Sequence, residues 1–396
     1  MAHQARRAEP ARWRQQGELV AVPCSILRGG TSKAVFLDAA DVPEAPGDRD
    51  RFLLTLMGSP DPRQIDGLGG ADLLTSKVAM IGPPTVAGAD LDYTFAQVSV
   101  RDARVDYDIS CGNISAAVGV YAVEHALVGA GGDTAFVRIH NTNTARIFYA
   151  EVPVADGHAR VEGPCRVDGV PGSGAEILLD MRDTIGTVTG SLLPTGSATD
   201  TLDVPGLGPV EVSIVDIAYL CFAVRAADVG VVPDAVPVVP GDELLCAVDA
   251  LQRAVARHLG LPEKTLVPVP ILVAEPHDYR TLAGGDPVAR GDVDLVAEVI
   301  GGQPLALHKA FPGGAGVTLA VAARIAGTVA YVPPSSHPVR IGHPSGRTEV
   351  DVVVRSSAGG EVVVERAAYS RTARRLMEGT SFLPAATLRP VPEGGS

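Results

Sequence analysis

The sequence is short of two kinds of side chain that nucleic-acid binding requires. Aromatic residues make up only 4% of its 396 residues, which argues against a stacking platform for single-stranded nucleic acid. Positive charge is also in deficit: 33 Lys and Arg residues stand against 46 Asp and Glu, a formal net charge of −13. Proteins that bind the phosphate backbone normally have the opposite balance. We therefore expect no nucleic-acid partner, and an anionic substrate must be held by local donors.

Cysteine is scarce and widely spaced. The chain has five cysteines, an odd number with no CxxC pair: Cys24, Cys111, Cys165, Cys221 and Cys246. This spacing excludes a zinc site of the spaced-cysteine type, so no metal is expected. Unpaired cysteines are typical of a reducing compartment. The sequence therefore predicts free thiols in a cytoplasmic protein.

Long apolar runs are absent. No segment reaches the roughly 18 apolar residues that cross a bilayer, so no membrane association is expected. Four arginines lie near the N-terminus, but no apolar stretch follows them, which excludes a secretory signal. An organelle transit peptide is the alternative to a frayed tail. We expect residues 1–17 to form a flexible tail.

Short β-branched runs separated by Gly- and Pro-containing turns dominate the rest of the chain. Two segments, residues 113–128 and 316–326, predict helices that are apolar nearly all round and therefore buried. A third helix, residues 242–259, is amphipathic and is expected on the outer surface. Because strands outnumber helices without strict βαβ alternation, the predicted class is α+β and not Rossmann.

One buried helix falls in each half of the chain. This predicts two similar domains, each a mixed sheet wrapped around one central helix. The turn-rich stretch at 191–203 marks the boundary. The expected domains are residues 18–190 and 191–396, and the last strand is allowed to return to the first domain.

Gly-rich stretches first suggest a nucleotide site, but their residue order excludes it. The segment from Arg28 to Lys33 lacks the P-loop order, and Asp72 stands where a dinucleotide fingerprint needs glycine. Backbone N–H groups in such turns can still bind a carboxylate. Arg28, Thr31, Ser32 and Lys33 would add side-chain donors. The alternative is a plain strand–turn–strand.

Two residues could supply acid–base chemistry. Cys111 precedes Gly112-Asn113 at the start of the first buried helix, where the helix dipole favours a thiolate and the backbone favours an anion. Lys77 lies among apolar residues and small hydroxyls, and desolvation there would favour a neutral amine. The alternatives are a small buried side chain for Cys111 and a snorkelling strand lysine for Lys77. Together they could act as base and acid on a carbon acid, although spacing does not show that they meet.

Several ordered motifs resemble the PrpF-type isomerase family. They run through nearly the whole chain: Arg28-Gly29-Gly30-Thr31-Ser32-Lys33, Gly58-Ser59-Pro60-Asp61, Gln64-Ile65-Asp66-Gly67-Leu68-Gly69-Gly70, Thr75-Ser76-Lys77-Val78-Ala79, Cys111-Gly112-Asn113, Leu193-Pro194-Thr195-Gly196, His343-Pro344-Ser345-Gly346 and Arg371-Thr372-Ala373-Arg374. The resemblance implies a diaminopimelate epimerase-like fold. It also implies a cofactor-independent isomerase or tautomerase of an unsaturated di- or tricarboxylate, such as a 2-methylaconitate-, aconitate- or oxalomesaconate-like acid.

The resemblance also assigns roles to residues. Lys77 would remove an allylic proton and Cys111 would act on the other face, and which of them is base or acid can vary with the substrate. The residues expected to bind the substrate are Arg28, Thr31, Ser32, Gly69, Gly70, Ser76, Gly112, Asn113 and Lys309. Relatives often carry a Pro-Lys pair where this chain has Pro268-Val269, and Lys309 is included because it could replace that lysine. The expected partners are a small anionic polycarboxylate and a second copy of the chain.

Two other functions are carried as alternatives. A two-base amino-acid epimerase or racemase would use a thiol in each half, but residues 313–316 before the second buried helix contain no cysteine. A non-catalytic protein that binds a polycarboxylate and assists a dehydratase would need neither acid nor base.

Overall fold

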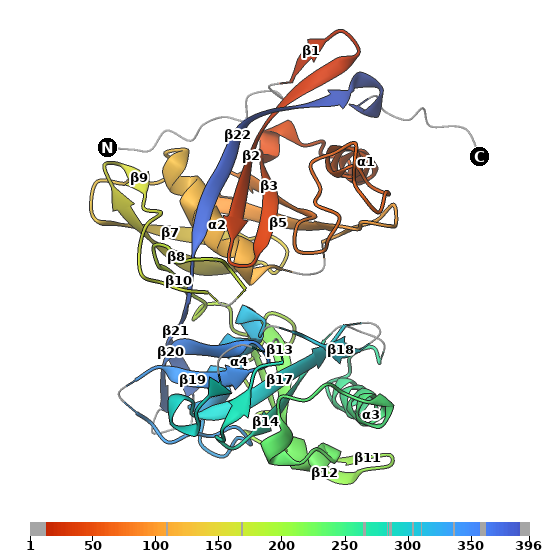
Figure 1. The fold of residues 1–396 in the computed structure, drawn as a ribbon, viewed down its shortest axis with the longest axis vertical. Coiled ribbons are helices and arrows are strands. Elements are labelled where there is room, and N and C mark those ends of the chain that lie inside the picture. Colours follow the sequence, from red (N-terminus) through yellow and green to blue (C-terminus); the bar gives the residue numbers. More distant parts are fainter. Residues whose placement is uncertain are drawn as a thin grey trace, which may run out of the picture. The chain divides into compact units, whose positions relative to one another are not determined.

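The computed structural model (Figure 1) describes residues 13–107, 110–167, 169–263, 267–282, 284, 287–302, 305–309, 311–335, 337–356 and 362–388. Most of the expected tail therefore lies outside the described residues, while Arg14–Gln16 form strand β1. The chain divides into two compact units. The first comprises residues 1–179 and 371–396, and the second comprises residues 180–370. This division falls before the turn-rich stretch at 191–203 and gives the last strand, β22, to the first unit.

Over its described residues, the first unit is one mixed sheet with two α-helices. Strand β22 lies beside β2 over its whole length, although the two are at opposite ends of the chain (Figure 1). The elements are β1, β2 (Leu19–Gly29), β3 (Ser32–Asp38), α1 (Pro46–Met57), β4 (Lys77–Gly82), β5 (Leu91–Val98), β6 (Val105–Asp106), α2 (Gly112–Glu124), β7 (Thr134–Asn141), β8 (Arg146–Ala155), β9 (His158–Ala159) and β22 (Ala373–Pro384).

The second unit has its own mixed sheet. Its elements are β11 (Asp200–Val204), β12 (Gly208–Ile217), β13 (Tyr219–Arg225), α3 (Asp242–His258), β14 (Val269–Ala274), β15 (Tyr279–Arg280), β16 (Pro287–Val288), β17 (Leu295–Gly301), β18 (Ala306–Leu307), α4 (Gly313–Ala323), β19 (Val339–His343), β20 (Gly346–Ser356) and β21 (Val362–Arg371). A further strand, β10 (Ile177–Asp180), lies where the chain passes from one unit to the next.

The two units repeat one strand-pairing pattern. In the first, the order β2-β3-β4-β5-β7-β8 pairs antiparallel, parallel, antiparallel, parallel and antiparallel. In the second, β12-β13-β14-β17-β19-β20 repeats that sequence of pairings. Helices α1 and α3 occupy equivalent places in the chain order, as do α2 and α4. The prediction of two similar halves with an α+β fold is therefore confirmed.

Each unit has a central helix inside its sheet. Helix α2 contacts β2, β22 and β8, and α4 contacts β12, β13 and β20. Ten residues of α2 in a row, from Ile114 to Val123, are buried. A Cβ on Gly119 would crowd Val152 and Ala150 of β8, so glycine allows helix and strand to approach closely. Within the described ranges, none of the helices has the length and apolar character that crossing a bilayer takes.

Candidate active site

Lys77 begins β4 and points to the side of the sheet that carries α2. Its register partner on β3 is Ala34, and partners in register share one face of a sheet. Two residues further along β3, on that same face, Phe36 stacks on Tyr121 of α2 with 5.4 Å between ring centres. Val78, the next residue of β4, packs instead in the core cluster that contains Phe52 of α1.

The ammonium of Lys77 is enclosed and hydrogen-bonded. The residue is 6% exposed, and Nζ donates to Oε1 of Gln97 on β5 at 2.5 Å. Nζ also lies 5.2 Å from the ring centre of Phe95. The Gln97 amide in turn donates to the carbonyls of Ser76 at 2.9 Å and Leu73 at 3.2 Å. Gln97 was not predicted as a site residue, because only the β4–β5 register brings it to Lys77.

Cys111 is the N-cap residue of α2. Its backbone is extended (φ −124°, ψ 100°), and its carbonyl accepts from the backbone N–H of Ser115 at 3.0 Å. The thiol is half-buried. It lies at the positive end of the helix dipole, and the first turn contains no acidic side chain that would compete for an anion. The position favours the binding of a carboxylate at Gly112 and Asn113.

Asn113 joins the start of α2 to the turn between β2 and β3. Its Nδ2 donates to Oγ1 of Thr31 at 2.9 Å, and its Oδ1 accepts from Nε of Arg371 at 3.1 Å. A Cβ on Gly29 would overlap the Asn113 carbonyl, and one on Gly30 (φ +48°) would overlap its side chain. The turn can therefore pack on the helix only with glycine at both positions.

The turn between β2 and β3 also contains a buried hydroxyl, that of Ser32, without a hydrogen-bond partner in the described residues. Ser32 pairs in register with Gly29, so it shares the face directed at α2. It is 1% exposed, and its Oγ has no hydrogen-bond partner in the part of the chain that the structure describes. A buried polar atom without a partner costs free energy unless a ligand or water satisfies it. Ser32 thus offers an unsatisfied group beside the start of α2.

Arg28 is engaged in the turn itself. Its Nη1 donates to the carbonyls of Gly30 at 3.0 Å and Thr372 at 2.8 Å. Burial and the nearby Arg374 lower the pKa of its guanidinium. Arg28 alternates with Gly29 along β2 and so points to the opposite face from Ser32. Its role as a substrate ligand stays a prediction, whereas Arg371, which contacts Asn113, was not predicted as a site residue.

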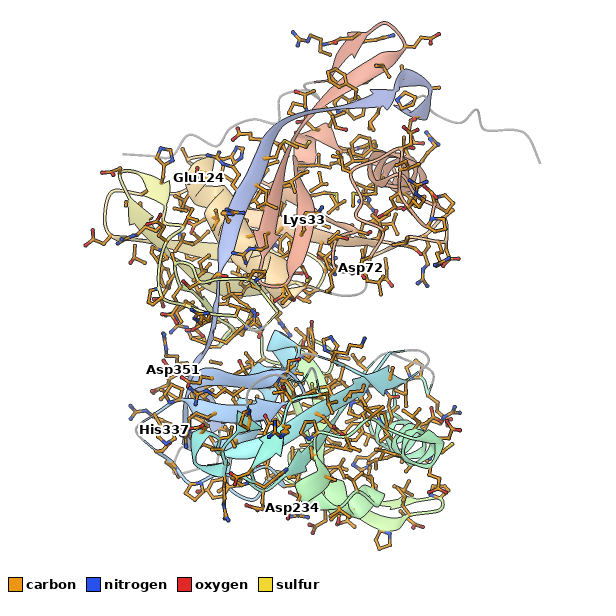
Figure 2. The ribbon with its side chains drawn as sticks, in the orientation of Figure 1. Lys33, Asp72, Glu124, Asp234, His337 and Asp351 are labelled. Carbon is orange, nitrogen blue, oxygen red and sulfur yellow. The ribbon has the colours of Figure 1, made fainter. Side chains whose placement is uncertain are left out.

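The loop before β4 is built around Gln64. This residue is 2% exposed with φ +46°, and its Oε1 accepts from the backbone of Ala71 at 2.8 Å and the hydroxyl of Ser76 at 2.7 Å. A Cβ on Gly69 would overlap the Gln64 amide, and one on Gly70 would overlap Thr75. Gly69, Gly70 and Ser76 therefore shape the segment that leads into Lys77. Figure 2 labels Asp72 within this loop and Lys33 on β3.

Strand β4, which Lys77 begins, contacts α2, the helix that Cys111 caps. Asn113 contacts the turn that precedes β3, and Tyr121, two turns later, contacts Phe36 further along β3, so the helix runs alongside this strand. Lys77 pairs with Ala34 between those two contacts. The Lys77 side chain donates to Gln97, whose amide donates in turn to the carbonyl of Ser76, the residue before β4.

The second unit lacks these groups at the equivalent positions. Strand β14 begins with Val269 where β4 begins with Lys77, and the N-cap of α4 is Pro312 where that of α2 is Cys111. Lys309 precedes α4 and is exposed, and its carbonyl accepts from the Ser345 hydroxyl. Lys309 is thus not among the residues that the first unit brings together, and its role stays a prediction.

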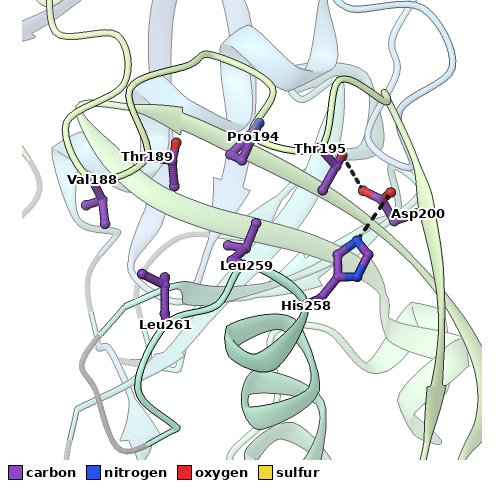
Figure 3. A pocket seen from close by; sticks show the side chains of 8 residues that line it. All are labelled: Val188, Thr189, Pro194, Thr195, Asp200, His258, Leu259 and Leu261. Carbon is purple, nitrogen blue, oxygen red and sulfur yellow. Dashed lines mark hydrogen bonds and ion pairs between the residues drawn. The ribbon is translucent and has the colours of Figure 1, made fainter.

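A pocket of about 520 Å³ in the second unit contains none of the predicted site residues (Figure 3). Thr195 Oγ1 donates to Asp200 at 2.8 Å, and His258 lies 3.7 Å from the same carboxylate. These contacts tie the loop that contains Leu193-Pro194-Thr195-Gly196 to the end of α3.

Across the described parts of the chain, no three His, Cys, Asp or Glu side chains are grouped so that they could hold a metal ion.

The chain is similar over nearly its whole length to curated isomerases. It is 44% identical to the 3-methylitaconate isomerase of Eubacterium barkeri, with 93% of this chain and 98% of the relative covered. It is 38% identical to the (4E)-oxalomesaconate Delta-isomerase of Novosphingobium sp. (strain KA1), with 93% and 99% covered.

Solved structures agree with these relatives. A crystal structure of methylitaconate-delta-isomerase matches with a TM-score of 0.85 at 42% identity, covering 96% of this chain and 100% of that one. A hydroxyproline epimerase from Agrobacterium vitis matches with a TM-score of 0.52 at 12% identity, covering 96% and 98%, and shows the shared epimerase-like fold. The PrpF protein family model matches residues 19–384, and the chain belongs to the PrpF family.

Proposed function

We propose that this protein is an isomerase of a small unsaturated di- or tricarboxylate and that it moves or rotates a double bond through proton transfer. The relatives named above support the reaction class. The observation that carries the site is a buried lysine amine on the sheet face that packs against α2, the helix whose N-cap is Cys111. An enclosed amine and a thiol at a helix N-terminus are the residue types that general base and acid catalysis needs.

A substrate carboxylate would bind where α2 begins. The backbone of Gly112 and Asn113 faces it with the positive end of the helix dipole, and the unsatisfied Ser32 hydroxyl and Thr31 lie beside it. Arg371, 9% exposed and bonded to Asn113, adds a fixed positive charge. These donors offset the chain's negative net charge locally.

The proton transfers balance without an added group. The neutral amine of Lys77 takes the allylic proton, so one C–H bond breaks and one N–H bond forms. The electron pair spreads into a dienolate whose negative charge rests on the carboxylate oxygens, near the helix N-terminus. Cys111 then gives its proton to the far end of the allylic system, and the ammonium and thiolate return to their starting states through solvent. We propose on this basis that no cofactor takes part.

Proton NMR in heavy water tests the proposal. A panel of methylitaconate-, methylaconitate-, aconitate- and oxalomesaconate-type acids is incubated with the enzyme. We expect deuterium to enter an allylic position of at least one acid, with conversion to its isomer. A protein that only binds a polycarboxylate would leave every acid protonated, and that result would contradict the proposal.

We also propose that the protein works in the cytoplasm. All five cysteines are free thiols, as expected in a reducing compartment. Cell fractionation tests this, and recovery of the protein from an oxidising compartment would contradict it.

A further inference from the structure

We propose that Gln97 is a positioning residue that aims the Lys77 amine through an uncharged hydrogen-bond acceptor. The inference rests on the proposed role of Lys77 as base. Gln97 touches no reacting atom in this account, because it acts through the lysine alone. Its Oε1 receives the hydrogen bond of Lys77 Nζ at 2.5 Å, across the β4–β5 pair.

The orientation of the Gln97 amide is fixed by its other contacts. Its Nε2 donates to the carbonyls of Ser76 and Leu73, and both of these atoms are acceptors only. If the amide were flipped, its oxygen would face two carbonyl oxygens, which are also acceptors. Its NH₂ would face the Lys77 amine, which is also a donor. The amide oxygen therefore has to face Lys77. Through this bond the flexible lysine side chain is held in one direction.

The chemistry of the acceptor matters as much as its place. An amide oxygen accepts from both an ammonium and a neutral amine, so it holds the lysine in either state and leaves the amine lone pair available. A carboxylate at the same place would form an enclosed ion pair and favour the ammonium strongly. Gln97 thus supplies a tether without a charge that would block the base.

The charged and titratable groups around Lys77 fit this account. On β3, β4 and β5, its neighbours on the α2 face are Ala34, Ala79 and Phe95, which carry no charge. The titratable groups nearest in register and sequence are Asp106 on β6, the partner of Gln97; Cys111 on α2; and Asp72 in the preceding loop. Over the described residues, no carboxylate forms an ion pair with Lys77.

The second unit supplies a comparison within the chain. At the place of Lys77 it has Val269, and Gly301 of β17 lies across from it, where a Cβ would meet the Val269 side chain at 3.9 Å. The glutamine is therefore absent from the repeat in which the lysine is absent.

The test compares Gln97→Glu with Gln97→Leu and a control, Gln15→Glu, which makes the same change at an exposed residue. Gln97→Glu should lower kcat at pH 7 at least tenfold with little change in KM, and should move the rising limb of the pH–rate profile at least one unit higher. Gln97→Leu should lower kcat at all pH values without that upward movement. An unmoved limb in Gln97→Glu would overturn the proposal.

A second measurement does not depend on turnover. The chain has only four lysines, Lys33, Lys77, Lys264 and Lys309, so ¹³C-lysine labelling gives few signals, and Lys77→Arg assigns the one that matters. In Gln97→Glu, only the Lys77 signal should titrate at higher pH, while Gln15→Glu matches wild type. An identical Lys77 titration in wild type and Gln97→Glu would refute the coupling. Activity in Lys77→Ala would instead refute the proposed base, whatever the NMR result.

Discussion

The proposed role of Lys77 depends on its place as the first residue of a buried strand. A lysine in a strand usually extends its ammonium into water. Here the sheet continues on both sides, with Ala34 on β3 and Gln97 on β5, and the side chain is enclosed. The cost of desolvating the amine is offset by one hydrogen bond and one aromatic face.

Replacing Lys77 by alanine should remove turnover while the fold remains. The loss of a general base lowers rates by about 10²–10⁴-fold, and we expect the upper part of that range in kcat for the best substrate of the NMR panel. The far-ultraviolet circular dichroism spectrum and the urea midpoint serve as controls for folding. A folded Lys77→Ala variant with wild-type kcat would contradict the assignment of the base.

Four of the five thiols should differ in reactivity according to burial. Burial raises the pKa of Cys221 to about 12 and also raises the pKa of Cys24, so both should resist iodoacetamide at pH 7.5. Cys111 and the exposed Cys246 should react. A bound polycarboxylate should slow the modification of Cys111 at least tenfold and leave Cys246 unchanged. Mass spectrometry of the digested protein measures each site, and equal protection of both thiols would contradict a ligand at the start of α2.

Sequence reasoning finds some of these residues and not others for a physical reason. Lys77, Cys111 and Asn113 lie in short motifs whose chemistry can be read locally. Gln97 sits in an ordinary strand, and only the register of two strands gives it a role. Arg371 reaches Asn113 across 258 positions of sequence, so no local pattern connects them.

At the scale of elements, the β2–β3 turn depends on glycine. Gly30→Ala would place a Cβ on a left-handed residue (φ +48°) and into the Asn113 side chain. We expect it to lose more than about 2 kcal/mol of unfolding free energy in urea, together with most of the activity.

The matched control for this change is Gly17→Ala. Gly17 also has a positive φ (+64°), but nothing lies within 4 Å of its added Cβ. Only the backbone penalty of about 1 kcal/mol applies there. Equal losses at the two sites would mean that contact with α2 does not matter at Gly30.

Glu298 of β17 should make the second unit sensitive to pH. The residue is fully buried; its Oε2 accepts from the Val238 N–H at 2.7 Å, and its Oε1 has no partner in the described ranges. Desolvation raises its pKa from 4.5 to about 7. As the pH rises from 4.5 to 7, the unfolded chain loses this proton before the folded chain does. The stability that the proton supplies below pH 4.5 is therefore lost across that window.

Glu298→Gln keeps the shape and removes the titration. Its unfolding free energy relative to wild type should rise between pH 4.5 and 7 and then level off, by a total on the order of 3 kcal/mol. Urea unfolding at pH 5 and pH 8 measures the difference. Glu162→Gln, at an exposed site, is the control and should show no such change. A difference between Glu298→Gln and wild type that stays constant with pH would show that Glu298 has the same pKa in the folded and unfolded chains.

The ends of the central helices show where the pattern is insufficient. Apolar residues continue to 128, so the pattern predicts a helix to that point, but α2 ends at Glu124. Ala126 adopts a left-handed backbone (φ +52°), and Leu127 N bonds back to Ala122 O at 2.8 Å. A glycine usually marks such an ending, and none stands there. Helix α4 begins at Gly313, ahead of the predicted start at residue 316. The prediction starts too late because the low helix propensity of glycine argues against a helix at Gly313-Gly314.

At the scale of the molecule, the two units share one strand-pairing pattern, and the proposed catalytic residues Lys77 and Cys111 lie in the first unit. The repeat could be predicted from two buried apolar helices, because a helix without a polar face needs a sheet around it. In the proposed site, three side chains distinguish the first unit: Lys77, Gln97 and Cys111. Their counterparts in the second unit are Val269, Gly301 and Pro312, none of which can transfer a proton.

This asymmetry predicts which substrates the protein leaves untouched. Inversion at an amino-acid α-carbon needs one group to remove the proton from one face and another to return it to the opposite face. A scaffold with a thiol at each central helix could do this, but here only α2 has a cysteine N-cap. We therefore expect no α-deuterium in proline, diaminopimelate or other amino acids after incubation in heavy water, under conditions where an unsaturated acid exchanges fully. Because Pro312→Ser leaves Lys77 and Cys111 in place, its exchange rate per folded molecule should match wild type, whereas Cys111→Ser should fall by at least 100-fold. Deuterium at an amino-acid α-carbon, or an equal loss in both variants, would show that the second central helix takes part in proton transfer.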